Sequence, residues 1–202
     1  MIVDLRDYRT RPGCRDALIS CCEETLFPEQ RRLGATFLGL FREPDDPDRF
    51  VWLRGMADAE SRARVLTAFY TEGDLWRARR AEVNRWIADS SDVLLVRPLA
   101  EHHPSRGPRA VVMVRHLEPT PLSGDAAAEL RRRVTESVCA AGGAVVATFA
   151  TDPMRNNYPR HPIRVGEHGL VWFASFPRRT AVHGLDPLDQ RWLTPTDTSE
   201  LR

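Results

Sequence analysis

Two strand-like segments recur in both halves of the chain, and the loop that joins them differs between the halves. In the second half, Gly143–Phe149 is followed by the polar loop Asp152–Arg164 and by the strand-like Leu170–Ala174. The first half holds the same two segments around the plain acidic loop Glu43–Asp48. Self-similarity at a fixed spacing is the signature of a repeated structural unit. The sequence therefore predicts a diverged tandem repeat whose second copy acquired a longer, proline-stiffened loop.

The spacing of the matched segments locates one insertion. The matches are Val3–Arg6 with Val112–Arg115 and Gly34-Ala35 with Gly143-Ala144, both at a shift of 109, and Val51-Trp52 with Val171-Trp172 at a shift of 120. A constant shift over two strands and the helix between them indicates duplicated topology. The jump of 11 then places the insertion in the loop before the third strand of the second copy.

Each half is predicted to be a split βαβ, or ferredoxin-like, unit with the element order βαββαβ. We place the first module at 1–100, a linker at 101–109 and the second module at 110–202. In the second module the second helix must be short, within Thr180–Trp192, and the last strand lies near Trp192–Thr196. One such sheet has an apolar face that its own helices leave uncovered. The predicted fold class is α+β, with tandem ferredoxin-like modules that pair their sheets as a dimeric α/β-barrel-type fold around a central cleft.

Composition excludes several classes of function. The chain has 202 residues and a formal net charge of +1, and all 29 of its basic residues are Arg. The absence of lysine excludes Schiff-base catalysis, lysine-bound pyridoxal phosphate and a P-loop lysine. Interspersed charges leave no electrostatic footprint for nucleic acid, and no apolar run approaches the ~20 residues of a membrane helix. The N-terminus enters a strand pattern without a signal-peptide core, so we expect a cytoplasmic protein.

No familiar cofactor or metal motif occurs in the sequence. Gly-x-Gly-x-x-Gly, Walker, Gly-x-Ser-x-Gly and His-Glu-x-x-His patterns are all absent, which leaves dinucleotide enzymes, NTPases, serine hydrolases of that type and zincins without support. The four cysteines fall in helical segments without Cys-x-x-Cys spacing, and we expect them to be reduced. We therefore expect chemistry by His, Tyr, Arg and carboxylates, with no bound cofactor and no metal.

The long loop supplies most of the candidate site residues. Arginine forks bind carboxylates, amides donate hydrogen bonds, and histidine titrates near neutrality. Long loops without secondary structure are frequently functional, although such polar groups can also satisfy the loop's own backbone. Trp52 and Trp172 are either core residues of the two sheets or apolar cleft walls. The candidate catalytic residues are His116, His161 and Tyr158, and the candidate substrate-binding residues are Arg6, Trp52, Arg54, Asn156, Asn157, Arg160, Arg164 and Trp172.

The order and spacing of these elements resemble a known family. The residues that carry the resemblance are Leu5–Arg9, Pro12-Gly13, Gly34-Ala35, Phe50–Gly55, Asp58, Arg62, Trp76 and Leu94–Pro98 in the first half, and Asn156–Arg164, Gly166-Glu167 and Val171-Trp172 in the second. Together they resemble the NIPSNAP family, as a two-module bacterial member. The resemblance implies a dimeric α/β-barrel architecture and places the chain beside antibiotic-biosynthesis monooxygenases. It assigns no reaction, because one fold hosts many functions.

These observations lead to a functional hypothesis with open alternatives. We expect a cofactor-independent isomerase, cyclase or lyase of secondary metabolism that acts by acid/base chemistry on a hydrophobic, oxygenated small molecule. In this hypothesis His116 or His161 moves a proton and Arg160 or Arg164 stabilises an enolate or carboxylate. The alternatives are a cofactor-independent monooxygenase of the antibiotic-biosynthesis type and a non-catalytic binding module. We expect a small-molecule substrate, no nucleic-acid or membrane partner, and a homodimer.

Overall fold

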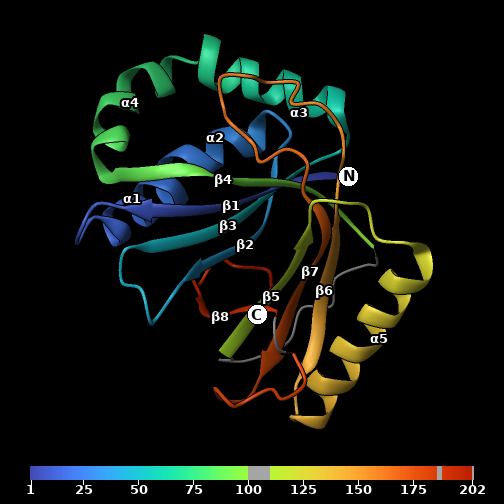
Figure 1. Ribbon diagram of the computed structural model, residues 1–202. Helices are drawn as coiled ribbons and strands as arrows, with labels where there is room; N and C mark the ends of the chain where they lie inside the picture. Colours follow the sequence, from blue (N-terminus) through green and yellow to red (C-terminus); the bar gives the residue numbers. More distant parts are fainter. Residues whose placement is uncertain (100–109, 186–187, 202) are drawn as a thin grey trace.

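Eight antiparallel strands close into one barrel. The computed structural model describes residues 1–99, 110–185 and 188–201, so the predicted linker 101–109 lies outside the described residues. The strands are β1 (Ile2–Thr10), β2 (Thr36–Arg42), β3 (Arg49–Met56), β4 (Ile87–Pro98), β5 (Ala110–Glu118), β6 (Ala144–Thr151), β7 (His168–Phe176) and β8 (Asp189–Pro195). Their order around the barrel is β1-β3-β2-β8-β5-β7-β6-β4, and Figure 1 shows the two halves stacked against each other. The predicted mixed α/β barrel fold is confirmed at this level.

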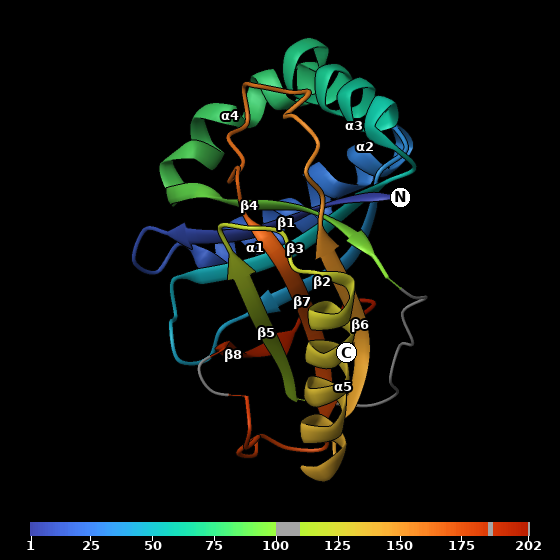
Figure 2. The same cartoon turned by 45° about the vertical axis from the view of Figure 1, so that its right-hand side comes forward.

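The helices cover the outside of the barrel unequally. In the first half, α1 (Arg15–Cys21), a π-helical segment η1 (Cys22–Leu26) and α2 (Phe27–Arg32) follow one another, as do α3 (Ala59–Leu66), a second π-helical segment η2 (Thr67–Glu72) and α4 (Asp74–Trp86). The second half has α5 (Gly124–Ala140). Figure 2 shows α5 along the outer face of the second sheet, and α3 and α4 beyond the first. In the described residues between β7 and β8 the chain forms no helix, so the predicted short helix within 180–192 is wrong.

The two halves share strand order and pairing register, but at a shift that corrects the sequence prediction. Leu5 lies opposite Leu53 in β3, and Met113 lies opposite Phe173 in β7. The strand β1 therefore matches β5 at a shift of 108, not 109, while β3 matches β7 at the predicted 120. The bulge in β2 between Phe37 and Gly39 recurs in β6 at that same shift of 108. A slip of one residue turns every side chain to the other face, so only the shift of 108 keeps corresponding side chains on corresponding faces.

Apolar side chains from all eight strands fill the barrel. They include Leu5, Phe41, Met113, Phe149 and Phe173, each at most 5% exposed. The cleft predicted between the facing sheets is therefore occupied by core side chains in the described structure. Trp52 and Trp172 lie on the opposite, outer faces of their sheets, within two separate apolar clusters. The outer face of each sheet is thus where a cavity can form.

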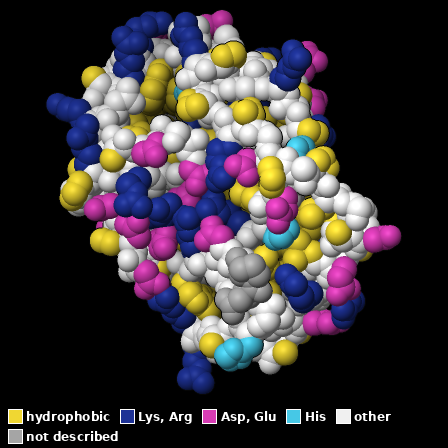
Figure 3. All heavy atoms as spheres, viewed as in Figure 1, with side chains coloured by type: hydrophobic (Ala, Val, Ile, Leu, Met, Phe, Trp, Pro, Cys, Tyr) yellow, Lys and Arg dark blue, Asp and Glu magenta, His cyan; other side chains and the backbone are white. Residues whose placement is uncertain are grey.

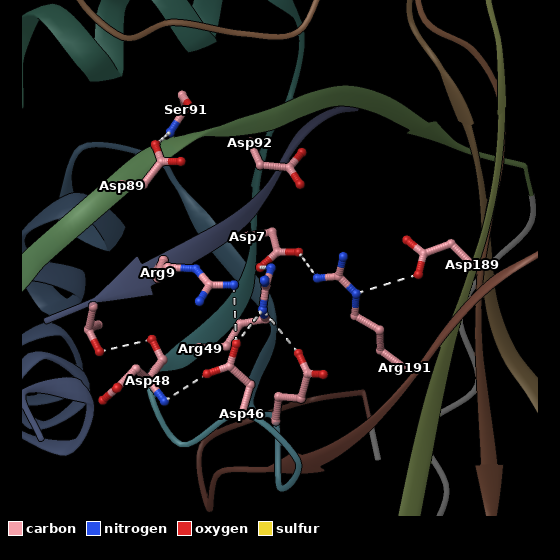
Figure 4. A network of polar contacts seen from close by, with 12 residues as sticks. Asp7, Arg9, Asp46, Asp48, Arg49, Asp89, Ser91, Asp92, Asp189 and Arg191 are labelled. Atoms are coloured by element: carbon pink, nitrogen blue, oxygen red, sulfur yellow. Dashed lines mark hydrogen bonds and ion pairs between the residues drawn. The ribbon is translucent and has the colours of Figure 1, made fainter. Parts of the chain in front are cut away.

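At one end of the barrel, ion pairs take the place of apolar side chains and join the two halves. Asp7 of β1 accepts from Arg49 of β3 at 2.8 Å and from Arg191 of β8, as Figure 4 shows. Arg115 of β5 donates to Asp189 at 2.5 Å and to Asp92 of β4 at 3.2 Å. These pairs add to the backbone seams of β2 with β8 and of β4 with β6. Basic and acidic side chains are interspersed on the face seen in Figure 3, without a patch of one sign.

Candidate functional site

A cavity of about 370 Å³ lies on the outer face of the first sheet. Strands β1 and β3 form its floor, the segments from α1 to α2 and from η2 to α4 form its walls, and the loop between β6 and β7 closes one side. Its apolar lining includes Leu18, Leu26, Phe27, Trp52, Trp76, Val83, Ile87 and Pro162, and its polar lining includes Arg6, Tyr8, Gln30, Tyr70, Asn84, Tyr158 and His161. An apolar cavity with a few convergent polar groups is the usual form of a small-molecule site.

The loop comes from the second half of the chain and docks on helices of the first. Asn157 accepts from Arg62 at 2.6 Å and donates to the carbonyl oxygen of Ala59 at 2.5 Å. The Tyr158 hydroxyl lies 2.9 Å from that of Thr71 in η2. Figures 1 and 2 both show the loop rising from the second sheet and passing over α3. The long loop predicted from the sequence is therefore an ordered cover over the first half's cavity.

Three buried arginines share one carboxylate beneath the cavity. The Asp4 side chain accepts from Arg54 at 2.5 Å and from Arg62 at 2.7 Å, and Arg6 approaches it at 3.7 Å. All four side chains are at most 2% exposed. Burial alone would raise the pKa of Asp4, but the guanidinium groups of Arg54, Arg62 and Arg6 hold that pKa well below its usual range. In the described part of the chain, Asp4 is the carboxylate paired with these three cations, so the cluster carries two positive charges in excess.

Three polar atoms of cavity-lining residues are buried without a hydrogen-bond partner in the described structure. They are Nη1 of Arg6, Nε1 of Trp52 and Nδ1 of His161. The 3.7 Å separation of Arg6 Nη1 from Asp4 exceeds hydrogen-bonding range. Leaving buried polar groups unpaired costs roughly 1–3 kcal/mol each. All three residues line the cavity, so a ligand acceptor or donor that reaches these buried atoms would supply the missing hydrogen bond.

The pKa values of two cavity-lining side chains are shifted in opposite directions. Burial, together with the nearby Arg6 and Arg54 guanidinium groups, lowers the pKa of His161 to about 2. Burial also raises the pKa of Tyr8 to about 12, while its hydroxyl accepts from Arg6 Nε at 2.8 Å. Both side chains are therefore neutral at physiological pH in the unliganded protein. Strongly perturbed groups in a cavity are typical of functional sites.

The structure brings together some of the predicted site residues and separates others. Arg6, Trp52, Tyr158, Arg160 and His161 line the cavity. Arg54 lies just below, where it bonds Asp4, Gln30 and Tyr70, and Asn156 and Asn157 hold the loop through Arg62.

Three predicted residues lie elsewhere. His116 and Arg164 line a separate surface pocket beside Arg115 and Asp189, with His116 Nε2 3.4 Å from Glu118 and Arg164 bonded to Glu167 and Asp92. Trp172 is 1% exposed in the apolar cluster of the second half. These three do not contribute to the cavity, because β5, the end of the loop and β7 place them in other surroundings.

The second half lacks the polar cluster at the matching positions. Asp4 lies opposite Arg54, whereas Val112 lies opposite Ala174; Arg6 lies opposite Trp52, whereas Val114 lies opposite Trp172. Val112, Val114, Trp172 and Ala174 are packed in an apolar cluster with α5. The barrel is therefore asymmetric, because one half provides the polar floor of the cavity and the other provides its cover.

Comparison with known proteins identifies the fold. No family model and no curated protein sequence matches the chain. Among solved structures, a putative monooxygenase from Fusobacterium nucleatum matches with a TM-score of 0.61 and 12% identity over 96% of this chain and 91% of that chain. The barrel has the fold of that protein. An anthrone oxidase-like protein matches with a TM-score of 0.58 and 10% identity over 96% of this chain and 91% of that chain.

The predicted NIPSNAP resemblance also has a counterpart among solved structures. A NIPSNAP family protein from Agrobacterium tumefaciens matches with 22% identity and a TM-score of 0.43 over 48% of this chain and 91% of that chain. The solved structures similar to the chain thus include NIPSNAP proteins and monooxygenase-type barrels, as predicted. None of the helices in the described ranges is long and apolar enough to cross a membrane.

Proposed function

We propose that the chain is a cofactor-independent enzyme that performs acid/base chemistry on a hydrophobic, oxygenated small molecule held in the first half's cavity. The observation that carries the proposal is the set of unpartnered polar atoms on Arg6, Trp52 and His161 within an aromatic-lined cavity. The substrate class fits secondary metabolism. The reaction is an isomerisation, cyclisation or elimination, in which one group takes a proton from carbon while another stabilises the resulting enolate.

Each residue has a role that its position supports. The His161 and Tyr158 rings lie edge to face in the loop, with centroids 5.2 Å apart. His161 offers Nδ1 as the proton acceptor, and the negative charge that develops on the substrate raises the lowered pKa of its imidazole. Arg6 offers Nη1 to a developing oxyanion. Trp52 and Phe27, whose ring centroids are 5.1 Å apart, offer an apolar surface for a planar ring. The loop closes one side of the cavity, and the reduced access of water strengthens these electrostatic interactions.

The modular organisation and assembly belong to the same proposal. The common strand order, registers and bulge of the two halves support tandem ferredoxin-like modules at 1–100 and 110–202. We propose a cytoplasmic protein that forms a homodimer through its helices, because the closed barrel already pairs every strand edge within one chain.

Proton abstraction from carbon can be measured with enolisable aromatic ketones. We expect the protein to catalyse deuterium incorporation next to the carbonyl of 2-tetralone, and at the methylene of anthrone, in D₂O without oxygen, as followed by proton NMR. His161→Gln should lower the exchange rate ~100-fold or more, the usual contribution of a positioned base. The matched control His116→Gln should leave the rate unchanged, because His116 lies outside the cavity.

The same assay separates the alternatives. Exchange that persists in His161→Gln contradicts the assigned base, and no catalysed exchange with either ketone indicates a binding module. In air, conversion of anthrone to anthraquinone with uptake of one O₂ would indicate the monooxygenase. In that reaction one oxygen atom enters the product, the other leaves as water, and the methylene group supplies both hydrogens and both electron pairs needed.

A further inference from the structure

We infer that the ligand of this cavity is a planar aromatic acid that binds as a monoanion, with its charged oxygen atoms against Arg6 Nη1. The inference rests on the proposed function in taking the cavity as the ligand site, and it adds the charge and shape of what binds there. It further implies that binding changes the protonation of His161.

The buried arginine cluster carries an excess of positive charge. Arg6, Arg54 and Arg62 are buried around Asp4 alone, and Gln30 and Tyr70, which also accept from Arg54, are neutral acceptors. Buried charges are costly unless they are paired. Asp4 is fully engaged by Arg54 and Arg62 through both of its oxygens. Within this buried cluster, Arg6 is therefore the cavity-lining cation that lacks a hydrogen bond to a carboxylate.

Two hydrogen-bond donors of cavity-lining residues lack acceptors. Arg6 Nε donates to the Tyr8 hydroxyl at 2.8 Å, and the guanidinium carbon lies 5.1 Å and 5.3 Å from the ring centroids of Tyr8 and Trp52. These contacts fix the guanidinium plane, and Nη1 is buried without a hydrogen-bond partner. Trp52 Nε1 is a donor only. Two fixed donors that lack acceptors match a carboxylate or an enolate oxygen.

Aromatic side chains form much of the cavity lining. Phe27, Trp52 and Tyr70 present ring faces or edges, and Trp76 and Tyr158 extend the aromatic wall. Aromatic side chains favour stacked or edge-to-face contact with another ring. An inorganic anion would leave this apolar surface in contact with water. The lining therefore favours a planar ring that carries the acid group.

Binding of such an anion alters the charge around His161. The charged groups that face its imidazole are Arg6 and Asp4 from β1, Arg54 from β3 and Arg62 from α3, and the neighbouring rings are Tyr70 from η2 and Tyr158 from the loop. The unliganded cluster opposes protonation of His161. An added negative charge favours the imidazolium, so the His161 pKa rises and a proton is taken up with the ligand.

Isothermal titration with two matched probes tests the inference. We expect 2-naphthoate to bind one per chain, because the second half has Val112 and Val114 where the first has Asp4 and Arg6. The neutral isostere 2-naphthamide should bind ~10- to 100-fold more weakly, the usual contribution of a hydrogen bond to a charged group. Titrations at pH ~5.5 in buffers of different ionisation enthalpy should show net proton uptake with naphthoate and none with naphthamide, because a nearby opposite charge raises a pKa by ~1–3 units.

Variants and competitors give the remaining outcomes. His161→Gln should bind naphthoate without proton uptake, and inorganic phosphate should not compete at the concentrations at which naphthoate saturates. Equal affinity for the acid and the amide would contradict the inference that the ligand is an anion. Strong competition by phosphate would contradict the inference that the ligand is a planar aromatic acid. Binding by the wild type without proton uptake would contradict the coupling between ligand binding and protonation of His161. If naphthoate binds but the protein does not catalyse deuterium exchange of the ketones, only the proposed reaction is contradicted. If the protein catalyses that exchange but binds naphthoate no more tightly than naphthamide, only this inference is contradicted.

Discussion

Replacement of Asp4 by Asn is expected to lower the free energy of unfolding by ~3–5 kcal/mol, because removing one partner of a buried ion pair leaves the other charge uncompensated. Here the loss is shared by Arg54 and Arg62, which donate to Asp4 at 2.5 Å and 2.7 Å. For a chain of this size the melting temperature should fall by roughly 6–20 °C. Urea denaturation at pH 7 measures the free energy directly.

The effect of Asp4 should depend on pH in one direction. The folded-state pKa of Asp4 is lowered, so its stabilising contribution is complete above the unfolded-state pKa, ~3.9, and is lost as the pH falls toward the folded-state value. The difference between wild type and Asp4→Asn should therefore shrink below pH ~4. Asp16→Asn is the control, since Asp16 pairs with Arg42 in solvent, and surface pairs contribute ~0–1 kcal/mol. A loss of less than ~1 kcal/mol for Asp4→Asn would contradict the account of the cluster.

Replacement of Arg6 by Met is expected to weaken 2-naphthoate binding ~10- to 100-fold and yet to leave the melting temperature within ~4 °C of wild type, or higher. Arg6 lacks a hydrogen bond to Asp4, which it approaches at 3.7 Å, and it adds an uncompensated cation to the cluster. Residues placed for function often reduce stability. Calorimetric titration and thermal denaturation of the same preparation measure both quantities.

A second arginine on the same carboxylate is the matched control. Arg62 donates to Asp4 and to Asn157 at 2.7 Å and 2.6 Å and does not line the cavity. Arg62→Met should therefore lose stability by several kcal/mol. If Arg6→Met is destabilised as much as Arg62→Met, Arg6 is a structural residue and its place in ligand binding is contradicted.

The strands and the long loop could be predicted because their signals are local. Alternating apolar residues and the repeated Val-Trp pair indicate strands, and the loop's extra length is visible without any structure. The shift of 109 was wrong by one residue because valine-rich strands match almost equally well at neighbouring registers. Only the pairing of Leu5 with Leu53 and of Met113 with Phe173 decides which face each side chain takes.

The site was only partly predictable, because a helical pattern does not distinguish a core position from a cavity wall. Phe27 and Tyr70 follow apolar helical spacing, and they nonetheless line the cavity. Both are next to or within π-helical segments, which are frequent at functional sites. Asp4 carried a signal that was missed, because a carboxylate at alternate spacing with Arg6 in an otherwise buried strand implies a polar network on one face.

No pattern in the sequence indicates that the described residues between β7 and β8 form no helix. The connection from β7 to β8 starts at Pro177 and is shorter than the one that holds α3 and α4 in the first half, and it packs Leu185 and Leu188 on the outer face of the second sheet. The apolar outer face there is also filled by large side chains such as Trp172 and Trp192 and covered by α5. This packing leaves the first half's outer face as the place where the described structure holds an aromatic-lined cavity.

A crystal structure of the wild-type protein with 2-naphthoate tests the central claim most directly. The account predicts one ligand per chain in the cavity above β1 and β3, with a carboxylate oxygen within hydrogen-bonding distance of Arg6 Nη1 and the loop residue His161 against the acid group. Naphthoate bound between α5 and the second sheet, or in the first cavity with its carboxylate turned to solvent, would contradict it.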